Sequence, residues 1–228
     1  MSSLPSNVHV SKHPCLLAKL SRLRSKTTDA REVKSLVNDI ALIIGCEALA
    51  EVLTPVDGPK DETPIGFEYT TTTVEPQELS IVPILRSGLG MVEAIQTLLP
   101  TPVPVHHLGL YREPSTLEPV EYYNNLPQHV GSGSIGSTAS SLAIIVDPVI
   151  ATGGTCVAAI QTLKEWGVKK IVVLSVIAAL EGIQRAATEW ADGVEIYAAG
   201  VDAKLTPNGM LMPGVGDVGD RLFLTIGK

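Results

Sequence analysis

The chain has 228 residues, 45% of them hydrophobic, and a formal net charge of −7 at pH 7, which suits one domain over residues 1–228 with an ample core. The acidic balance argues against a nucleic-acid partner, because binding a phosphate backbone requires clustered lysine and arginine. Since no apolar run approaches the roughly 18 residues of a membrane span and no signal-peptide pattern opens the chain, we expect no membrane partner and a cytoplasmic location.

The chain should open with an arm and two helices. We expect residues 1–26 to form an N-terminal arm, polar over its first 14 residues and lying on the surface, that enters a short helix at residues 16–23. Asp29, three residues before Glu32, is typical of a capping box and predicts the start of a long helix. Residues 54–80 carry four prolines and four consecutive threonines, which indicates a loop and an edge strand.

Charged residues follow three predicted parallel strands. These strands and the residues that follow them are 79–85 with Arg86, 103–110 with Arg112, and 142–146 with Asp147. In an open α/β sheet, ligands bind outside the carboxyl ends of the strands, and arginine donates two hydrogen bonds at once to phosphate oxygens. The three side chains together predict an anion site at one sheet edge. Either arginine alone fits a surface salt bridge equally well.

The turn after the third strand is rich in glycine and threonine. Its sequence TGGT, residues 152–155, precedes an amphipathic helix that should end at Gly167, and the apolar run 170–177 completes a β-loop-α-β unit. Helix N–H groups, glycines that allow close approach, and threonine hydroxyls together suit one phosphate. The P-loop lysine and the dinucleotide G-x-G-x-x-G pattern are absent. The alternative is a plain turn with Thr155 as N-cap and Asp147 as a solvated acid.

The last third of the chain is less regular. The stretch 127–141 is a Gly/Ser-rich sequence that we expect to be a flexible connection. Beyond the β-loop-α-β unit, we expect a helix at 182–190 and a strand at 194–199. Residues 213–220 contain three glycines and two aspartates, which argues against a regular element there. Such a loop exposes backbone N–H and C=O groups that suit a flat heterocycle, although a plain hairpin turn is the alternative.

Cysteine and histidine give no sign of a protein-bound metal. Cys15, Cys46 and Cys156 are odd in number and include no C-x-x-C pair, which fits a reducing cytosol without structural zinc. The five histidines lack metal-ligand spacing, and the neighbours His106 and His107 would point to opposite faces of a strand. We interpret the histidines as structural.

Several motifs in the same order resemble the uracil phosphoribosyltransferase family. The stretch DPVIATGGT at 147–155 is similar to its phosphoribosyl-pyrophosphate loop, usually DPMLATGGS. The other matching stretches are His13-Pro14, PILRSGLGM at 83–91, GLYREPSTLEPV at 109–120, EGI at 181–183 and PGVGDVGD at 213–220. Val149, Ile150 and Thr155 are conservative departures. Ser87 replaces the usual Ala, Leu180 replaces the usual Pro, and the stretch 131–141 is longer and richer in Gly and Ser than usual, but none of these removes a charged family position.

The resemblance implies a fold and an assembly. The fold is α/β, a mainly parallel twisted sheet flanked by helices, as in type I phosphoribosyltransferases, with a β arm and a small hood. Residues 117–126 would form part of the arm, which packs on a partner subunit in a homodimer or homotetramer. GTP is left open as an activator.

The resemblance also implies a reaction and its residues. Phosphoribose passes from 5-phosphoribosyl 1-pyrophosphate to N1 of uracil, giving UMP and pyrophosphate in pyrimidine salvage. The pyrophosphate donor is implied to contact Arg86, Arg112, Asp147, Pro148, Val149, Ile150, Ala151, Thr152, Gly153, Gly154, Thr155 and Asp217. Uracil is implied to contact Leu211, Gly216, Asp217 and Val218, within a base-binding region at 202–222. The implied catalytic residues are Arg86, Arg112 and Asp217.

Magnesium is the implied cofactor. Many relatives have two adjacent acids before the phosphate loop, whereas Pro148 takes the second place here. We therefore expect pyrophosphate to carry Mg²⁺, with little direct ligation by the protein. Two other functions remain open. One is a non-catalytic uracil or nucleotide sensor on the same fold, which the acidic surface disfavours, and the other is a phosphoribosyltransferase for another base.

Overall fold

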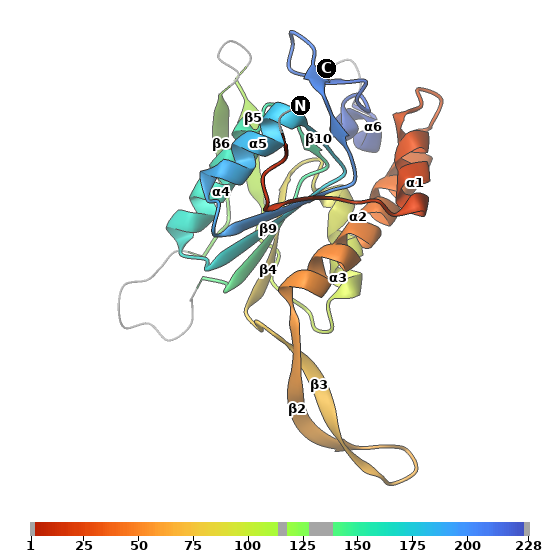
Figure 1. Ribbon diagram of the computed structural model, residues 1–228, viewed down its shortest axis with the longest axis vertical. Helices are drawn as coiled ribbons and strands as arrows, with labels where there is room; N and C mark the ends of the chain where they lie inside the picture. The colour runs from red at the N-terminus through yellow and green to blue at the C-terminus, as the bar shows by residue number, and fades with distance from the viewer. Residues whose placement is uncertain (1–2, 114–117, 128–138, 226–228) are drawn as a thin grey trace.

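The protein is a sheet sandwiched between two layers of helices, with a long hairpin projecting from the body (Figure 1). This computed structural model describes residues 3–113, 118–127 and 139–225. Among these residues, no helix is long and apolar enough to cross a membrane.

The central sheet is mainly parallel, which confirms the expected fold class. Its strands, in spatial order, are β1 (Val8–Val10), β11 (Val194–Ala198), β9 (Lys170–Ser175), β7 (Leu142–Val146), β4 (Leu79–Leu85), β5 (Leu108–Arg112) and β6 (Pro119–Asn124). Every neighbouring pair is parallel except β5 and β6, which are antiparallel.

Helices cover both faces of the sheet, which explains why its strands read as continuous apolar runs. One face carries α1 (Pro14–Arg24), α2 (Ala30–Val52) and α3 (Leu89–Leu98), and the other carries α4 (Gly154–Trp166) and α5 (Leu180–Glu189) (Figure 1). Alternate residues of β4 therefore enter different cores, Ile81 on one side and Val82 on the other. As predicted, Asp29 caps α2, accepting a hydrogen bond from the backbone N–H of Glu32.

A second layer of short elements lies beyond the carboxyl edge of the main sheet. A parallel three-stranded sheet joins β12 (Val201–Asp202), β10 (Ile177–Ala179) and β8 (Val149–Ile150). A small hood follows from β13 (Lys204–Leu205), β14 (Leu211–Met212) and α6 (Val218–Phe223). The predicted strand 170–177 is thus divided between β9 and β10, because the chain passes from one sheet to the next at Val176.

The N-terminus is not a surface arm throughout. Residues 8–10 form β1, an edge strand in which Val8 pairs with Ile196. Just before it, the buried side chain of Asn7 donates hydrogen bonds to the backbone oxygens of Ala187 and Val194. These pairings with α5 and β11 hold the N-terminal segment on the sheet.

The protruding arm lies elsewhere than the sequence predicts. Strands β2 (Thr54–Glu62) and β3 (Glu68–Glu75) pair with each other as an antiparallel hairpin that extends away from the body (Figure 1). The edge strand predicted at the threonine tract is confirmed as β3, whereas the loop predicted before it is wrong, because residues 54–62 form β2, whose edge position tolerates proline. The prediction of an arm at 117–126 was also wrong, because residues 119–124 form β6 of the main sheet.

Two other boundaries differ from the predictions, and a third prediction is not tested. Strand β5 begins only at Leu108 and includes Arg112, while Val105 makes one isolated bridge to Ile81. The loop at 213–220 becomes helical from Val218, because Asp217 supplies the N-cap. Most of the expected flexible connection, residues 128–138, lies outside the described residues.

Candidate active site

Three predicted site residues converge on the carboxyl edge of the main sheet. Asp147 directly follows β7, Arg86 directly follows β4, and Arg112 is the last residue of β5. Because β4 lies between β7 and β5, the three backbones end side by side. The sequence prediction of one shared edge is confirmed at the level of the strands.

The TGGT turn leads directly into the amino terminus of α4. Gly153 occupies the N-cap position with a φ of 81°, in the left-handed region, and the helix begins at Gly154. The interpretation of Thr155 as N-cap is therefore wrong. The first turn of a helix has N–H groups without intrahelical partners and carries the positive end of the helix dipole. The turn therefore has the geometry that an anion site requires.

The turn is held by direct backbone packing on α5. A Cβ atom added to Gly182 would lie 1.9 Å from the carbonyl oxygen of Ala151 and 2.9 Å from the nitrogen of Gly153. In the reverse direction, a Cβ atom on Gly153 would lie 2.5 Å from the carbonyl oxygen of Gly182. Only glycine fits at either contact, which gives the EGI motif a physical reason that its sequence alone does not reveal.

Asp147 is a buried acid, with 7% of its surface exposed. Its Oδ1 lies 3.5 Å from both the Ser87 hydroxyl and the backbone nitrogen of Val149. The alternative of a solvated loop acid is therefore wrong. Burial, and secondarily the charge of Asp147, raise the pKa of the Cys156 thiol far above its usual value. Cys156 consequently stays protonated and is unsuited to act as a nucleophile.

The loop at 213–217 forms the opposite wall. Gly214 and Gly216 have φ values of 67° and 73°, a conformation that favours glycine. Asp217 caps α6 by accepting a hydrogen bond from the backbone N–H of Asp220 at 2.9 Å. The structure thus gives Asp217 the turn-capping role that is usual for this residue type, beside any role that it has toward a ligand.

One cleft joins the two walls. It has a volume of about 160 Å³ and is lined on one side by Asp147, Val149 and Ala151 and on the other by Leu211, Val215 and residues 216–219. All four predicted base-contacting residues line this cleft, together with three residues of the predicted phosphate loop. A smaller hollow beside it is lined by Thr152, Gly153 and Thr155 as well as Asp147.

Sequence reasoning missed several residues of the cleft. Ser87, Gly209 and Met210 also line it. Ser87 could have been predicted, because it lies next to Arg86 within the motif at 83–91. Nothing in the sequence distinguishes Met210 as a lining residue.

Arg86 is not among the residues that line the cleft. Its side chain is half exposed and points toward α6, where its Nη2 lies 3.8 Å from Asp220 Oδ1 and 3.5 Å from Thr225 Oγ1. The guanidinium also lies 6.0 Å from the centre of the Phe223 ring. These are long contacts at the surface and hold the side chain weakly. Arg86 can therefore turn toward a ligand at the sheet edge at small energetic cost.

The site does not include a preformed metal cage. Among the described residues, no group of three or more His, Cys, Asp or Glu side chains is placed to hold a metal ion. The cleft does present two carboxylates, those of Asp147 and Asp217. These hard oxygen donors suit Mg²⁺, which commonly binds through one or two carboxylates plus substrate phosphates.

The fold and this site define a type I phosphoribosyltransferase. The structure resembles that of the AQ2163 protein from Aquifex aeolicus, with a TM-score of 0.84 and 29% identity over 96% of this chain and 98% of that chain. It also resembles adenine phosphoribosyltransferase from Trypanosoma brucei, with a TM-score of 0.54 and 19% identity over 92% of this chain and 90% of that chain. The second likeness shows the fold alone.

Sequence comparison identifies the family within this class. The family model described as uracil phosphoribosyltransferase matches residues 10–225. Over 220 residues, the chain is 42% identical to uracil phosphoribosyltransferase of Clostridioides difficile (strain 630) and 44% identical to that of Finegoldia magna. Each alignment covers 96% of this chain and 99% of the relative. The chain belongs to the uracil phosphoribosyltransferase family.

The Gly182 contact predicts how the phosphate turn fails. In Gly182→Ala, the new methyl group must push the turn at Ala151 and Gly153 away from α5. Because a displacement of about 1 Å can cost about 10²-fold in catalysis, we expect at least a roughly tenfold weaker affinity for 5-phosphoribosyl 1-pyrophosphate, measured by calorimetry. The matched control is Gly45→Ala, whose methyl meets only the flexible ends of Ile95 and Leu98. Equal affinities in the two variants would contradict the role given to this contact.

Proposed function

We propose that this protein transfers phosphoribose from 5-phosphoribosyl 1-pyrophosphate to N1 of uracil, releasing UMP and pyrophosphate, as a pentosyltransferase of pyrimidine salvage. The observation that carries the proposal is the cleft between residues 147–151 and a glycine-rich backbone wall, with the hollow of the TGGT turn directly beside it. A nucleotide product has a phosphate at one end and a base at the other. The two walls match these two ends in chemistry, and family membership supports the same reaction.

The donor is expected to bind across the turn and the sheet edge. In this proposal, residues 152–155 hold the 5′-phosphate through backbone N–H groups and threonine hydroxyls. Asp147 accepts hydrogen bonds from the ribose hydroxyls and leaves a negative charge near C1. As the bond from C1 to the pyrophosphate oxygen breaks, positive charge grows at C1 in an oxocarbenium-like transition state. The rate then depends on positioning and on fixed charges rather than on a covalent intermediate.

Uracil is proposed to be read by main-chain groups of residues 211–218. Uracil presents an O4 acceptor beside an N3–H donor, and cytosine reverses this pattern. A fixed wall that offers one N–H and one C=O therefore leaves both groups unpaired with cytosine. Unpaired buried polar groups cost about 1–3 kcal/mol each, which is sufficient for strong discrimination.

The departing pyrophosphate is assigned to Arg86 and Arg112. Both follow or end neighbouring strands at the sheet edge, and a guanidinium donates two hydrogen bonds at once to phosphate oxygens. The Mg²⁺ expected in this family would arrive with the pyrophosphate, with Asp147 and Asp217 as the carboxylates within reach. When bound, Mg²⁺ neutralises charge on the leaving group.

The reaction is tested with a panel of bases. Purified protein is mixed with 5-phosphoribosyl 1-pyrophosphate, Mg²⁺ and either uracil, hypoxanthine, adenine or orotate, and the absorbance change is followed. The proposal expects turnover with uracil alone. Turnover with another base would instead identify a phosphoribosyltransferase for that base. Uracil binding without turnover would instead identify a non-catalytic sensor. Repeating the uracil reaction with GTP tests whether that nucleotide is an activator.

Asp217 is proposed to act on the reaction as well as to cap α6. Asn also caps helices well, so Asp217→Asn removes the negative charge while it retains the fold. We expect turnover to fall about tenfold or more, while the affinity for uracil changes less because main-chain groups hold the base. Steady-state kinetics and calorimetric uracil binding measure the two effects.

Asp29→Asn provides the matched control for this variant. Asp29 caps α2 through the same type of hydrogen bond, 2.9 Å long, to the N–H three residues later, and it does not line the cleft. This variant should keep full turnover. Unchanged turnover in Asp217→Asn would reduce Asp217 to a helix cap.

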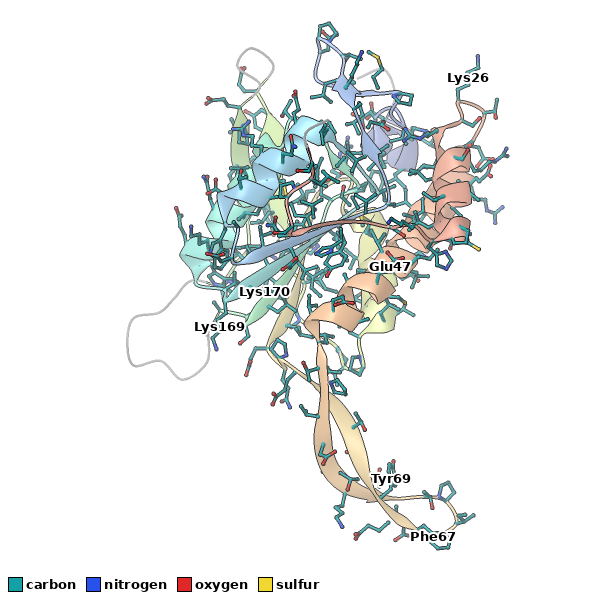
Figure 2. All side chains as sticks on the ribbon, in the orientation of Figure 1. Lys26, Glu47, Phe67, Tyr69, Lys169 and Lys170 are labelled. Carbon is teal, nitrogen blue, oxygen red and sulfur yellow. The ribbon has the colours of Figure 1, made fainter. Side chains whose placement is uncertain are left out.

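We further propose that the protein is a homodimer or homotetramer and that it is cytoplasmic. The arm supports the first proposal, because its far end exposes 81% of Ile65, 68% of Phe67 and 45% of Tyr69, and Figure 2 shows Phe67 and Tyr69 near this end. Exposed apolar side chains gathered in one place are typical of protein contacts.

The cytoplasmic proposal is supported by the cysteines, because their free thiols fit a reducing compartment.

Sedimentation tests the role of the arm. The wild-type protein should have a mass that is a multiple of 24.1 kDa, and Ile65→Ser with Phe67→Ser should shift the population toward the monomer. Leu17→Ser is the control, since Leu17 is 47% exposed on α1. An unchanged mass in the arm variant would place the subunit interface elsewhere.

A further inference from the structure

An ion pair outside the cleft holds the wall that faces the base. Asp202, at the end of β12, is 5% exposed and accepts two hydrogen bonds from Arg24 in the last turn of α1, at 2.7 and 3.0 Å. Neither residue lines the cleft. A buried carboxylate in a two-pronged arginine pair has a well-defined position. The pair can therefore serve as a fixed point for the chain around it.

Both polar backbone groups of Gly214 are attached to this pair. The Gly214 N–H donates to Asp202 Oδ2 at 2.8 Å, and its carbonyl oxygen accepts from Arg24 Nη1 at 2.8 Å. Gly214 has a positive φ, and an added Cβ atom would lie 2.3 Å from the Leu211 carbonyl oxygen. The position of the ion pair is thereby transmitted to the backbone of Leu211, Val215 and Gly216, which do line the cleft.

A second arginine fastens the same loop to the same helix end. Arg221 of α6 donates to the carbonyl oxygens of Val215 at 2.6 Å and Leu23 at 2.7 Å. It thereby joins the loop to a carbonyl group in the last turn of α1, which has no intrahelical partner. The loop contains two glycines with positive φ and has little intrinsic order of its own. The buried side chain of Val215 and these polar contacts from α1, β12 and α6 together fix its shape.

We propose that Arg24 and Asp202 are positioning residues that set the affinity and selectivity for the base by fixing the backbone at Gly214. The proposal rests on the proposed function, in which this wall reads uracil. The phosphate turn is held separately, by the packing of Gly182. Although β12 shares a small sheet with β8, the ion pair contacts only the loop directly, so it acts mainly on the base half of the cleft.

The test compares two arginines of α1. Arg24→Met removes the pair with Asp202. Arg22 lies two residues before Arg24, and Arg22→Met removes only its surface pair with Glu32. For Arg24→Met, we expect the KM for uracil to rise at least about tenfold, equivalent to about 1.4 kcal/mol, while kcat falls less. The KM for 5-phosphoribosyl 1-pyrophosphate should stay within about twofold of wild type. Arg22→Met should change each parameter by less than about twofold.

Conservative substitutions separate positioning from general stability. Arg24→Lys keeps the positive charge but cannot make all three hydrogen bonds of Arg24 to Asp202 and Gly214. The KM for uracil in this variant should therefore lie between those of wild type and Arg24→Met. If Arg24→Met does not fold, Asp202→Asn, which keeps the shape and one acceptor oxygen, takes its place in the comparison. A folded variant with the wild-type KM for uracil, or with equal rises for both substrates, would overturn the proposal.

Hydrogen exchange gives a readout that does not depend on turnover. The amide of Gly214 should exchange slowly in the wild-type protein and faster in Arg24→Met, with amides 152–155 unchanged. If the wild-type protein does not turn over uracil, the proposed function fails, yet this comparison still tests the ion pair. Equal exchange at Gly214 in both proteins would overturn the positioning role by itself.

Discussion

The contact of Gly182 with Ala151 and Gly153 is the constraint on which the site depends. Backbone meets backbone there, with no room for a Cβ atom. The phosphate turn therefore cannot move independently of α5, and α5 is packed on the main sheet with Ile183 fully buried. A short turn with two glycines gains in this way the rigidity of the sheet, which a preorganised anion site requires.

The loop at 213–217, which forms the wall proposed to face the base, is fixed by different interactions. It lies in a small hood of short strands and one short helix, where the side chains of Val215 and Val218 are buried. Charged hydrogen bonds from Arg24, Asp202 and Arg221 add to this apolar packing and fix the backbone of the loop. The two sides of the site are therefore fixed in different ways, the turn by backbone packing on α5 and the loop by buried apolar side chains and charged hydrogen bonds.

The sequence predicts the fold well where one physical signal dominates. Runs such as 79–85 and 142–146 are apolar without alternation because helices cover both faces of the sheet, and Asp147 and Gly153 follow from strand ends and turn chemistry. The arm could not be predicted, because a threonine-rich strand pairs equally well with its neighbour or with the sheet. Arg24 and Asp202 are 178 residues apart, and neither residue carries a local pattern that would indicate the other.

The central claim is that the cleft and the hollow beside it form one site, which holds a phosphate at the α4 turn and a base at the hood. Hydrogen exchange with saturating UMP tests this claim most directly, because this single nucleotide contains both groups. The account predicts that UMP slows exchange at amides 153–155 and also at amides 214–218, with both effects saturating at the same UMP concentration. Protection at only one of these two segments, or at two different concentrations, would contradict a shared site.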